Sequence, residues 1–129
     1  MTESVLDASA LIALLLGEQG GARVNHALAE AAMSTVNLAE VIGHFARKGS
    51  SEADIHEMLD PLPFTRVPLD DELAYHIGML LPLTRAAGLS LGDRACLALA
   101  RRLDVPALTA DRAWQTVAAP AGVRVELIR

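Results

Sequence analysis

Residues 4–17, Ser-Val-Leu-Asp-Ala-Ser-Ala-Leu-Ile-Ala-Leu-Leu-Leu-Gly, hold one complete unit of strand, acidic corner and helix. The apolar run from Ser4 to Asp7 predicts a short strand. Ala10 to Leu16 predicts a short helix, which Gly17 ends. Asp7 therefore stands at the corner where the strand gives way to the helix.

Strand and helix patterns alternate along the rest of the chain. Further strands are expected at about 33–36, 64–68, 106–109 and 123–127. Helices are expected at about 23–31, 38–47, 71–87, 92–103 and near 112, and Ser51 with Asp54 opens another as a capping box, which Pro61 and Pro63 break. Pro82 is expected to kink the longest helix. Such alternation predicts an α/β domain whose parallel sheet is covered by helices on both faces. With 129 residues and neither an internal repeat nor a long linker, residues 1–129 are expected to form one domain.

Four acidic residues stand where apolar runs give way to helices: Asp7, Glu40, Asp93 and Asp111. Sites in parallel sheets lie at the carboxyl ends of the strands, so these carboxylates are expected to converge. Carboxylates at close range repel unless they are protonated, spread apart or neutralised by a cation. Oxygen-only ligation favours magnesium or manganese. The pattern therefore predicts a metal-dependent site for phosphoryl transfer.

Helix capping is the competing interpretation of the same acids. Asn37 with Glu40, and Ser90 with Asp93, have the spacing of a capping box, and Asp111 has the position of a plain N-cap. Taken singly, each acid is more often a cap than a ligand. Acids at every strand-to-helix corner of one sheet edge exceed what capping requires, which favours the metal site for the set.

Residues near the acids suggest supporting roles. Ser9 and Thr109 each lie two residues from an acid and are candidates to orient a carboxylate or a metal-bound water. Arg94 and Arg112 directly follow acids, and they are either clamps for a substrate phosphate or exposed helix arginines. His44 lies one turn after Glu40 and is interpreted as a surface residue.

Composition limits the classes of function. A hydrophobic fraction of 52% and a mean hydropathy of +0.32 predict surplus apolar surface for an oligomer or partner interface. The net charge of −5 disfavours a protein that grips nucleic acid by bulk electrostatics, although bound divalent cations would offset most of it. Cys96 is the only cysteine, and it is interpreted as buried and inert.

The longest apolar stretch near the N-terminus is far shorter than the ~20 residues of a membrane helix. No basic segment precedes it, so we expect neither a signal peptide nor a membrane partner. We expect a cytoplasmic protein. The sequence also has no phosphate-binding Gly-rich motif, no Cys/His zinc spacing and no nucleophile elbow.

Four blocks of sequence carry a resemblance to a known family: VLDASALIALLLGE (5–18), STVNLAEV (34–41), LSLGDRACLALA (89–100) and LTADRAW (108–114). In this order and spacing they resemble PIN-domain ribonucleases, specifically the VapC-type toxins of toxin–antitoxin pairs. The blocks span nearly the whole chain, and the first and third are the more specific.

The resemblance implies a parallel five-stranded sheet in the order 3-2-1-4-5, a homodimer and an RNA substrate. It implies that Asp7, Glu40, Asp93 and Asp111 bind Mg²⁺ or Mn²⁺, and that an antitoxin covers the acidic site with its C-terminal segment. Many relatives carry Asn where Asp111 stands and a further acid a few residues on. Trp114 and its neighbours offer no such acid, so either Asp111 serves or the fourth ligand is missing.

Two other classes of protein remain as alternatives. A receiver-like signalling domain also has an acidic magnesium pocket, but it needs paired acids after its first strand and a lysine after its last. This chain has Asp7 alone and a single lysine, Lys48. A binding module with a degraded site is the third possibility, and the presence of all four acids speaks against it.

Overall fold

The fold is built on one parallel sheet of five strands. The computed structural model describes residues 1–129 and orders the strands β3-β2-β1-β4-β5. The strands are β1 (Ser4–Leu6), β2 (Ala31–Ser34), β3 (Thr65–Val67), β4 (Ala107–Thr109) and β5 (Val125–Leu127). The expected α/β class and the strand order 3-2-1-4-5 are both confirmed.

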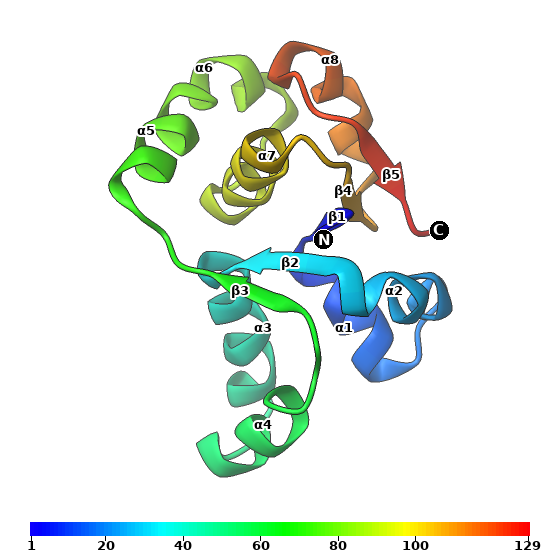
Figure 1. Ribbon diagram of the computed structural model, residues 1–129. Helices are drawn as coiled ribbons and strands as arrows, with labels where there is room; N and C mark the ends of the chain where they lie inside the picture. Colours follow the sequence, from blue (N-terminus) through cyan, green and yellow to red (C-terminus); the bar gives the residue numbers. More distant parts are fainter.

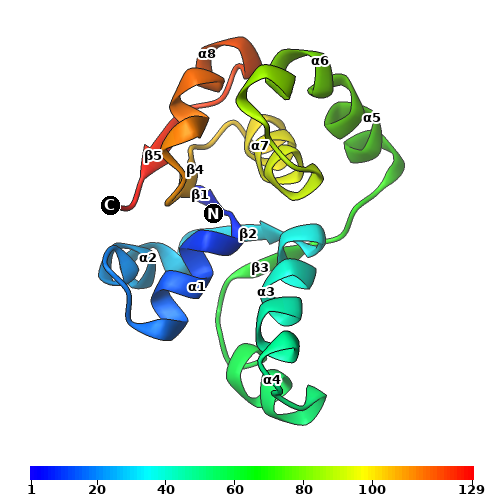
Figure 2. The same ribbon diagram turned by 180° about the vertical axis from the view of Figure 1, so that it is seen from behind.

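Helices fill the connections and cover both faces of the sheet. They are α1 (Ala8–Leu16), α2 (Gly21–Ala27), α3 (Thr35–Arg47), α4 (Glu52–Leu59), α5 (Asp71–Met79), α6 (Leu81–Thr84), α7 (Leu91–Leu103) and α8 (Ala118–Ala121). Three 3₁₀ turns accompany them: η1 (Leu28–Glu30), η2 (Arg85–Ala87) and η3 (Arg112–Thr116). Helices α1 to α4 lie on one side of the sheet and α5 to α8 on the other (Figures 1 and 2). None of these helices has the length and apolar character required to cross a membrane.

Two hydrophobic cores result, one on each face. Successive side chains of a strand point to opposite faces, so Val5 enters the core that contains α5 and α7 while Leu6 enters the core that contains α1 to α4. The other central strands, β2 and β4, divide their side chains in the same way. Trp114 is fully buried in the first of these cores, where it fills space between η3 and the sheet.

The second strand lies two residues earlier than its sequence suggests. The helix expected at 23–31 ends at Ala27, and a 3₁₀ turn leads to a strand that begins at Ala31. Ala31 aligns with Ser4 in the sheet, so strand pairing overrides the helical tendency of the alanines. Ser34 is therefore the last residue of β2 and also the N-cap of α3, where its Oγ accepts a hydrogen bond from the amide of Val36.

Pro82 breaks the long helix expected at 71–87 instead of kinking it. Helix α5 ends at Met79, and Pro82 lies in the first turn of the separate helix α6. Proline has no amide hydrogen, so it is tolerated in the first turn of a helix and not in its interior.

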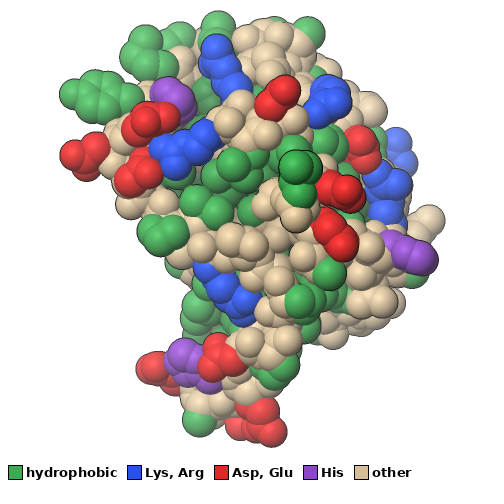
Figure 3. Space-filling model, in the orientation of Figure 1, with side chains coloured by type: hydrophobic (Ala, Val, Ile, Leu, Met, Phe, Trp, Pro, Cys, Tyr) green, Lys and Arg blue, Asp and Glu red, His purple; other side chains and the backbone are tan.

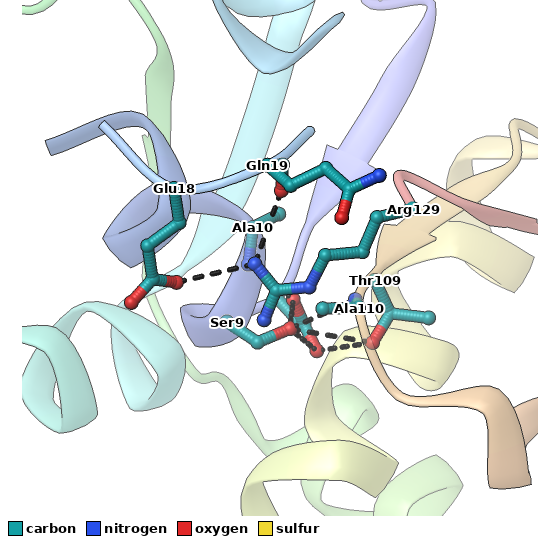
Figure 4. Close-up of polar contacts among 8 residues, drawn as sticks. Ser9, Ala10, Glu18, Gln19, Thr109, Ala110 and Arg129 are labelled. Carbon is teal, nitrogen blue, oxygen red and sulfur yellow. Dashed lines mark hydrogen bonds and ion pairs between the residues drawn. The ribbon is translucent and has the colours of Figure 1, made fainter. Parts of the chain in front are cut away.

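The C-terminus is tied to the loop between α1 and α2. A side chain at Gly20 would place its Cβ 2.6 Å from the carbonyl oxygen of Ile128, so only glycine permits this approach. Arg129 donates from Nη1 to Oε1 of Glu18 at 3.2 Å and to the carbonyl of Gln19 at 3.0 Å (Figure 4). These contacts join the residues that follow β5 to the segment between α1 and α2.

Candidate active site

The four acids line a single pocket at the carboxyl ends of the strands. The pocket has a volume of about 260 Å³ and is lined by Asp7, Ala8, Ser9, Ile12, Asn37, Glu40, Asp93 and Asp111. The parallel sheet brings these residues together, because β1, β2 and β4 all end at this edge and the helices that follow begin there. Asp93 comes from the first turn of α7, one of the helices on the other face of the sheet from α1 and α3.

Asp7 is the most buried of the acids, with 5% of its surface exposed. It is the N-cap of α1, accepting the amide of Ala10 at 2.8 Å. The hydroxyl of Ser9 lies 2.7 and 2.9 Å from its two carboxylate oxygens, and Thr109 donates to Oδ2 at 2.6 Å (Figure 4). Ser9 in turn accepts the amide of Ala110 at 3.0 Å. Ser9 and Thr109 therefore orient the carboxylate of Asp7 across the β1–β4 pair.

Burial shapes the protonation of this carboxyl group. Loss of solvent raises the pKa of Asp7 from its ordinary value of 3.8 to about 6, and the nearby charge of Asp93 adds to the rise. The hydrogen bonds from Thr109, Ser9 and Ala10 favour the charged form and act in the opposite direction. A cation in the pocket would favour the charged form further.

Asp93 is both a helix cap and a wall of the pocket. Ser90 and Asp93 form the capping box that their spacing predicts, with Oδ2 of Asp93 accepting the amide of Ser90 at 2.9 Å. The cap uses only Oδ2. Capping and pocket lining are thus compatible in one residue.

The second predicted capping box is wrong. Ser34 caps α3, so Asn37 and Glu40 lie inside the helix and neither is at its end. Asn37 instead donates from Nδ2 to Oε1 of Glu40 at 2.9 Å and to the carbonyl of Gly92 at 2.9 Å. Sequence spacing suggested a cap for Asn37 and contained no sign of its contact with α7.

Asp111 is an exposed acid at the start of η3. It caps η3 through a 3.0 Å bond from the amide of Ala113, and its own amide donates to Oγ1 of Thr109 at 3.0 Å. The plain N-cap interpretation is therefore satisfied for Asp111, while its side chain also borders the pocket.

The two arginines beside the acids do not enter the pocket. The guanidinium of Arg94 turns toward α5, where Nη1 donates to the carbonyl of Ile77 at 2.9 Å, so it is not placed to clamp a phosphate in the pocket. Arg112 is an exposed residue of η3 that does not line the pocket. His44 is half-buried and lines an adjoining hollow with Arg47, instead of lying on the open surface as its sequence position suggests.

Cys96 is buried near the acids, and its thiol is unreactive. It is fully buried, and burial raises the pKa of its thiol well above the usual value. The charges of Asp7, Asp93 and Glu40 raise that pKa further. A thiol held in this state is not a nucleophile.

The donor chemistry of the pocket fits a hard divalent cation. Every acidic side chain offers carboxylate oxygen, the donor that Mg²⁺ and Mn²⁺ prefer. No three His, Cys, Asp or Glu side chains are arranged to hold one ion as they stand.

Comparison with known proteins places the chain in a family. The family model described as "PIN domain" matches residues 4–120, which include the whole pocket. The chain belongs to the PIN-domain family. PIN domains are nucleases, so this PIN domain is a hydrolase that acts on nucleic acid. No curated protein matches its sequence significantly.

Several solved structures with the same fold are chains of VapBC or toxin–antitoxin complexes. The PIN domain is similar to a chain of DNA-bound VapBC from Salmonella typhimurium, with 16% identity, a TM-score of 0.73 and all of both chains covered. It is similar to a chain of a toxin–antitoxin complex from Klebsiella pneumoniae, with 21% identity, a TM-score of 0.71 and 98% of each chain covered. A third is DNA-bound VapBC2 from Rickettsia felis, with 15% identity, a TM-score of 0.74 and 98% of each chain covered.

Proposed function

We propose that this PIN domain is a divalent-metal-dependent endoribonuclease that acts as the toxin of a toxin–antitoxin pair. The observation that carries the proposal is the convergence of four acids, from four separate segments of the chain, on one pocket. The similar structures are chains of VapBC complexes matched over nearly their full length, which supports an antitoxin partner.

In this proposal Asp7 and Asp93 hold the principal cation, Mg²⁺ or Mn²⁺, and Glu40 and Asp111 complete the site. When bound, the cation supplies Lewis-acid chemistry, activating water and neutralising charge on the phosphoryl oxygens. Ser9 and Thr109 keep the carboxylate of Asp7 oriented toward the pocket by donating to it. No side chain is needed as the nucleophile, and the hydroxyls of Ser9 and Thr109 are already engaged with Asp7.

Cleavage of total cellular RNA by the purified, antitoxin-free protein tests this function. We expect discrete products with Mg²⁺ or Mn²⁺, and none in EDTA or with the Asp93→Asn variant. Asp71→Asn is the matched control, because Asp71 is an exposed acid in the first turn of α5 that does not line the pocket. Cleavage that persists in EDTA or in Asp93→Asn would contradict the proposal.

The signalling alternative has little structural support. A receiver-like site needs a lysine beside its acids, and Lys48 instead caps the far end of α3 outside the acidic pocket. Labelling with a small phosphodonor would detect such an activity, and we expect no stable label on Asp7.

A further inference from the structure

Glu40 differs from the other acids in how it is held. Asp7, Asp93 and Asp111 are each fixed by hydrogen bonds from amides within three residues, Asp7 and Asp111 as N-caps and Asp93 through the capping box of α7. Glu40 lies in the second turn of α3 and caps nothing. Its long side chain therefore needs another means of keeping its carboxylate at the pocket.

Asn37 supplies a direct contact. Its side chain is 1% exposed, and its one amide nitrogen bonds both Oε1 of Glu40 and the carbonyl of Gly92 at 2.9 Å. An amide group carries two hydrogens, so one can serve each acceptor. Asn37 thereby links the Glu40 carboxylate to the first turn of α7, which contacts α3.

Gly92 supplies the space. A Cβ at this position would lie 2.5 Å from Cδ of Glu40 and 2.6 Å from Oε2, inside any normal contact distance. Gly92 is helical and does not have a positive φ, so backbone conformation does not call for glycine here. Helix propensity favours alanine over glycine, so the requirement at this position comes from the carboxylate above it.

Asn37 also carries a cost that folding alone does not explain. Its Oδ1 is buried without a hydrogen-bond partner, an arrangement that native proteins usually avoid. An apolar side chain of the same size would remove that unsatisfied group. The retained amide is therefore explained by its donor contacts to Glu40 and Gly92.

We propose that Asn37 and Gly92 are positioning residues that hold the Glu40 carboxylate at the metal pocket, Asn37 by donating to it and Gly92 by leaving room for it. The inference rests on the proposed function, in which Glu40 is a ligand. Neither residue touches the cation or the substrate in this proposal. Both act through Glu40.

Binding of Mn²⁺ to the metal-free protein, followed by electron paramagnetic resonance of the unbound ion, tests this without any cleavage assay. The variants are Glu40→Gln, Asn37→Leu, Gly92→Ala, and each of the last two combined with Glu40→Gln. We expect Asn37→Leu and Gly92→Ala each to weaken Mn²⁺ binding on the order of 10-fold or more, as loss of a residue supporting a metal ligand does. Each double variant should bind no more weakly than Glu40→Gln alone, because a positioning residue has no effect once its target is removed.

Thermal unfolding separates positioning from a general loss of structure. Gly92→Ala improves helix propensity, so its melting temperature should not fall even though its Mn²⁺ binding does. Thr84→Val is the matched control, because it removes a buried hydrogen bond, from Thr84 to the carbonyl of Leu80, in α6 and away from the acids. It should lower the melting temperature and leave Mn²⁺ binding unchanged.

The outcomes distinguish this inference from the proposed function. If Glu40→Gln binds Mn²⁺ as tightly as the unmodified protein, Glu40 is not a ligand, and both the ligand set and this inference fail. If Glu40→Gln weakens binding while Gly92→Ala and Asn37→Leu do not, the positioning role alone is overturned. Fully additive losses in the double variants would overturn it as well.

Discussion

At the scale of single residues, Asp7 shows the conflict between stability and function. A carboxyl group that is 5% exposed keeps its charge at the expense of folding, and that is why its pKa rises to about 6. Ser9 and Thr109 reduce the penalty by donating to the carboxylate without removing it. The proposed role of Asp7 as a cation ligand requires its charged form, whereas the folded chain holds the neutral form more easily.

The pH dependence of stability follows from this pKa. Because the pKa of Asp7 is higher in the folded protein than its ordinary value of 3.8, the folded state binds more protons than the unfolded state between about pH 4 and pH 6. The contribution of Asp7 to the free energy of unfolding therefore falls as pH rises through that window. A rise from 3.8 to about 6 corresponds to roughly 3 kcal/mol at most.

Substitution Asp7→Asn should remove this dependence. In EDTA at pH 7 we expect the variant to be more stable than the unmodified protein by about 1–3 kcal/mol, since the buried charge is gone. Urea unfolding of both proteins between pH 4 and pH 7 measures the difference. Equal slopes of stability against pH in the two proteins would rule out Asp7 as the titrating group.

At the scale of elements, helix α3 places His44 and Arg47 on the same face as Glu40. Glu40, His44 and Arg47 follow one face of this helix, and they line a hollow of about 400 Å³ between α1 and α3. This hollow shares Ala8, Ile12 and Glu40 with the acidic pocket, so the two are adjoining depressions of one surface. The positively charged side chain of Arg47 lines this hollow together with Glu40.

Arg47 is therefore expected to contact an RNA phosphate outside the acidic pocket. Substitution Arg47→Gln should weaken RNA binding and lower the slope of log K against log salt by about 0.7, the value for one phosphate contact on a single strand. Binding of a short RNA to the Asp93→Asn protein at several salt concentrations measures it without cleavage. Lys48→Gln is the control, because it removes the same charge one residue beyond the hollow. An equal effect of the two substitutions would mean that Arg47 contributes only through the overall charge of the protein and makes no specific phosphate contact.

At the scale of the whole molecule, the surplus apolar surface has a location. Tyr75 is 76% exposed, Met79 is 70% exposed and Leu83 is 47% exposed, and these side chains lie along α5 and α6. Part of this hydrophobic surface is visible over α5 and α6 in Figure 3. An apolar surface of this kind is typical of a protein–protein contact. We propose that its partner is a second copy of this chain, in the homodimer that the family resemblance implies.

Charges introduced into this surface should separate the dimer. The double variant Tyr75→Glu/Met79→Glu is expected to elute as a monomer in size-exclusion chromatography with light scattering, and to remain folded because both side chains are exposed. Leu103→Glu, at the end of α7, is the control for an exposed leucine elsewhere. A dimer that survives in the double variant would place the interface on another face.

The sequence by itself determined the α/β class, the acidic corners after β1 and β4, and the capping box of Ser90 and Asp93. These features depend on local pattern: alternation of apolar runs, and side chains that bond amides within three residues. Sequence also singled out Ser9 and Thr109, although which acid Thr109 would serve was not decided by its neighbours. Its hydroxyl donates to Asp7, more than 100 positions away, as well as accepting the amide of Asp111 beside it.

Only the tertiary structure decided the remainder. The start of β2 at Ala31 depends on pairing with Ser4, the turn of Arg94 toward Ile77 depends on the packing of α5 against α7, and the role of Asn37 depends on Gly92. Each is a contact between residues far apart in the chain, where packing and burial outweigh local preference. Neighbouring residues along a chain determine which helices and strands form and how they are capped, whereas the direction of a long polar side chain is set by whichever acceptor the fold brings within reach.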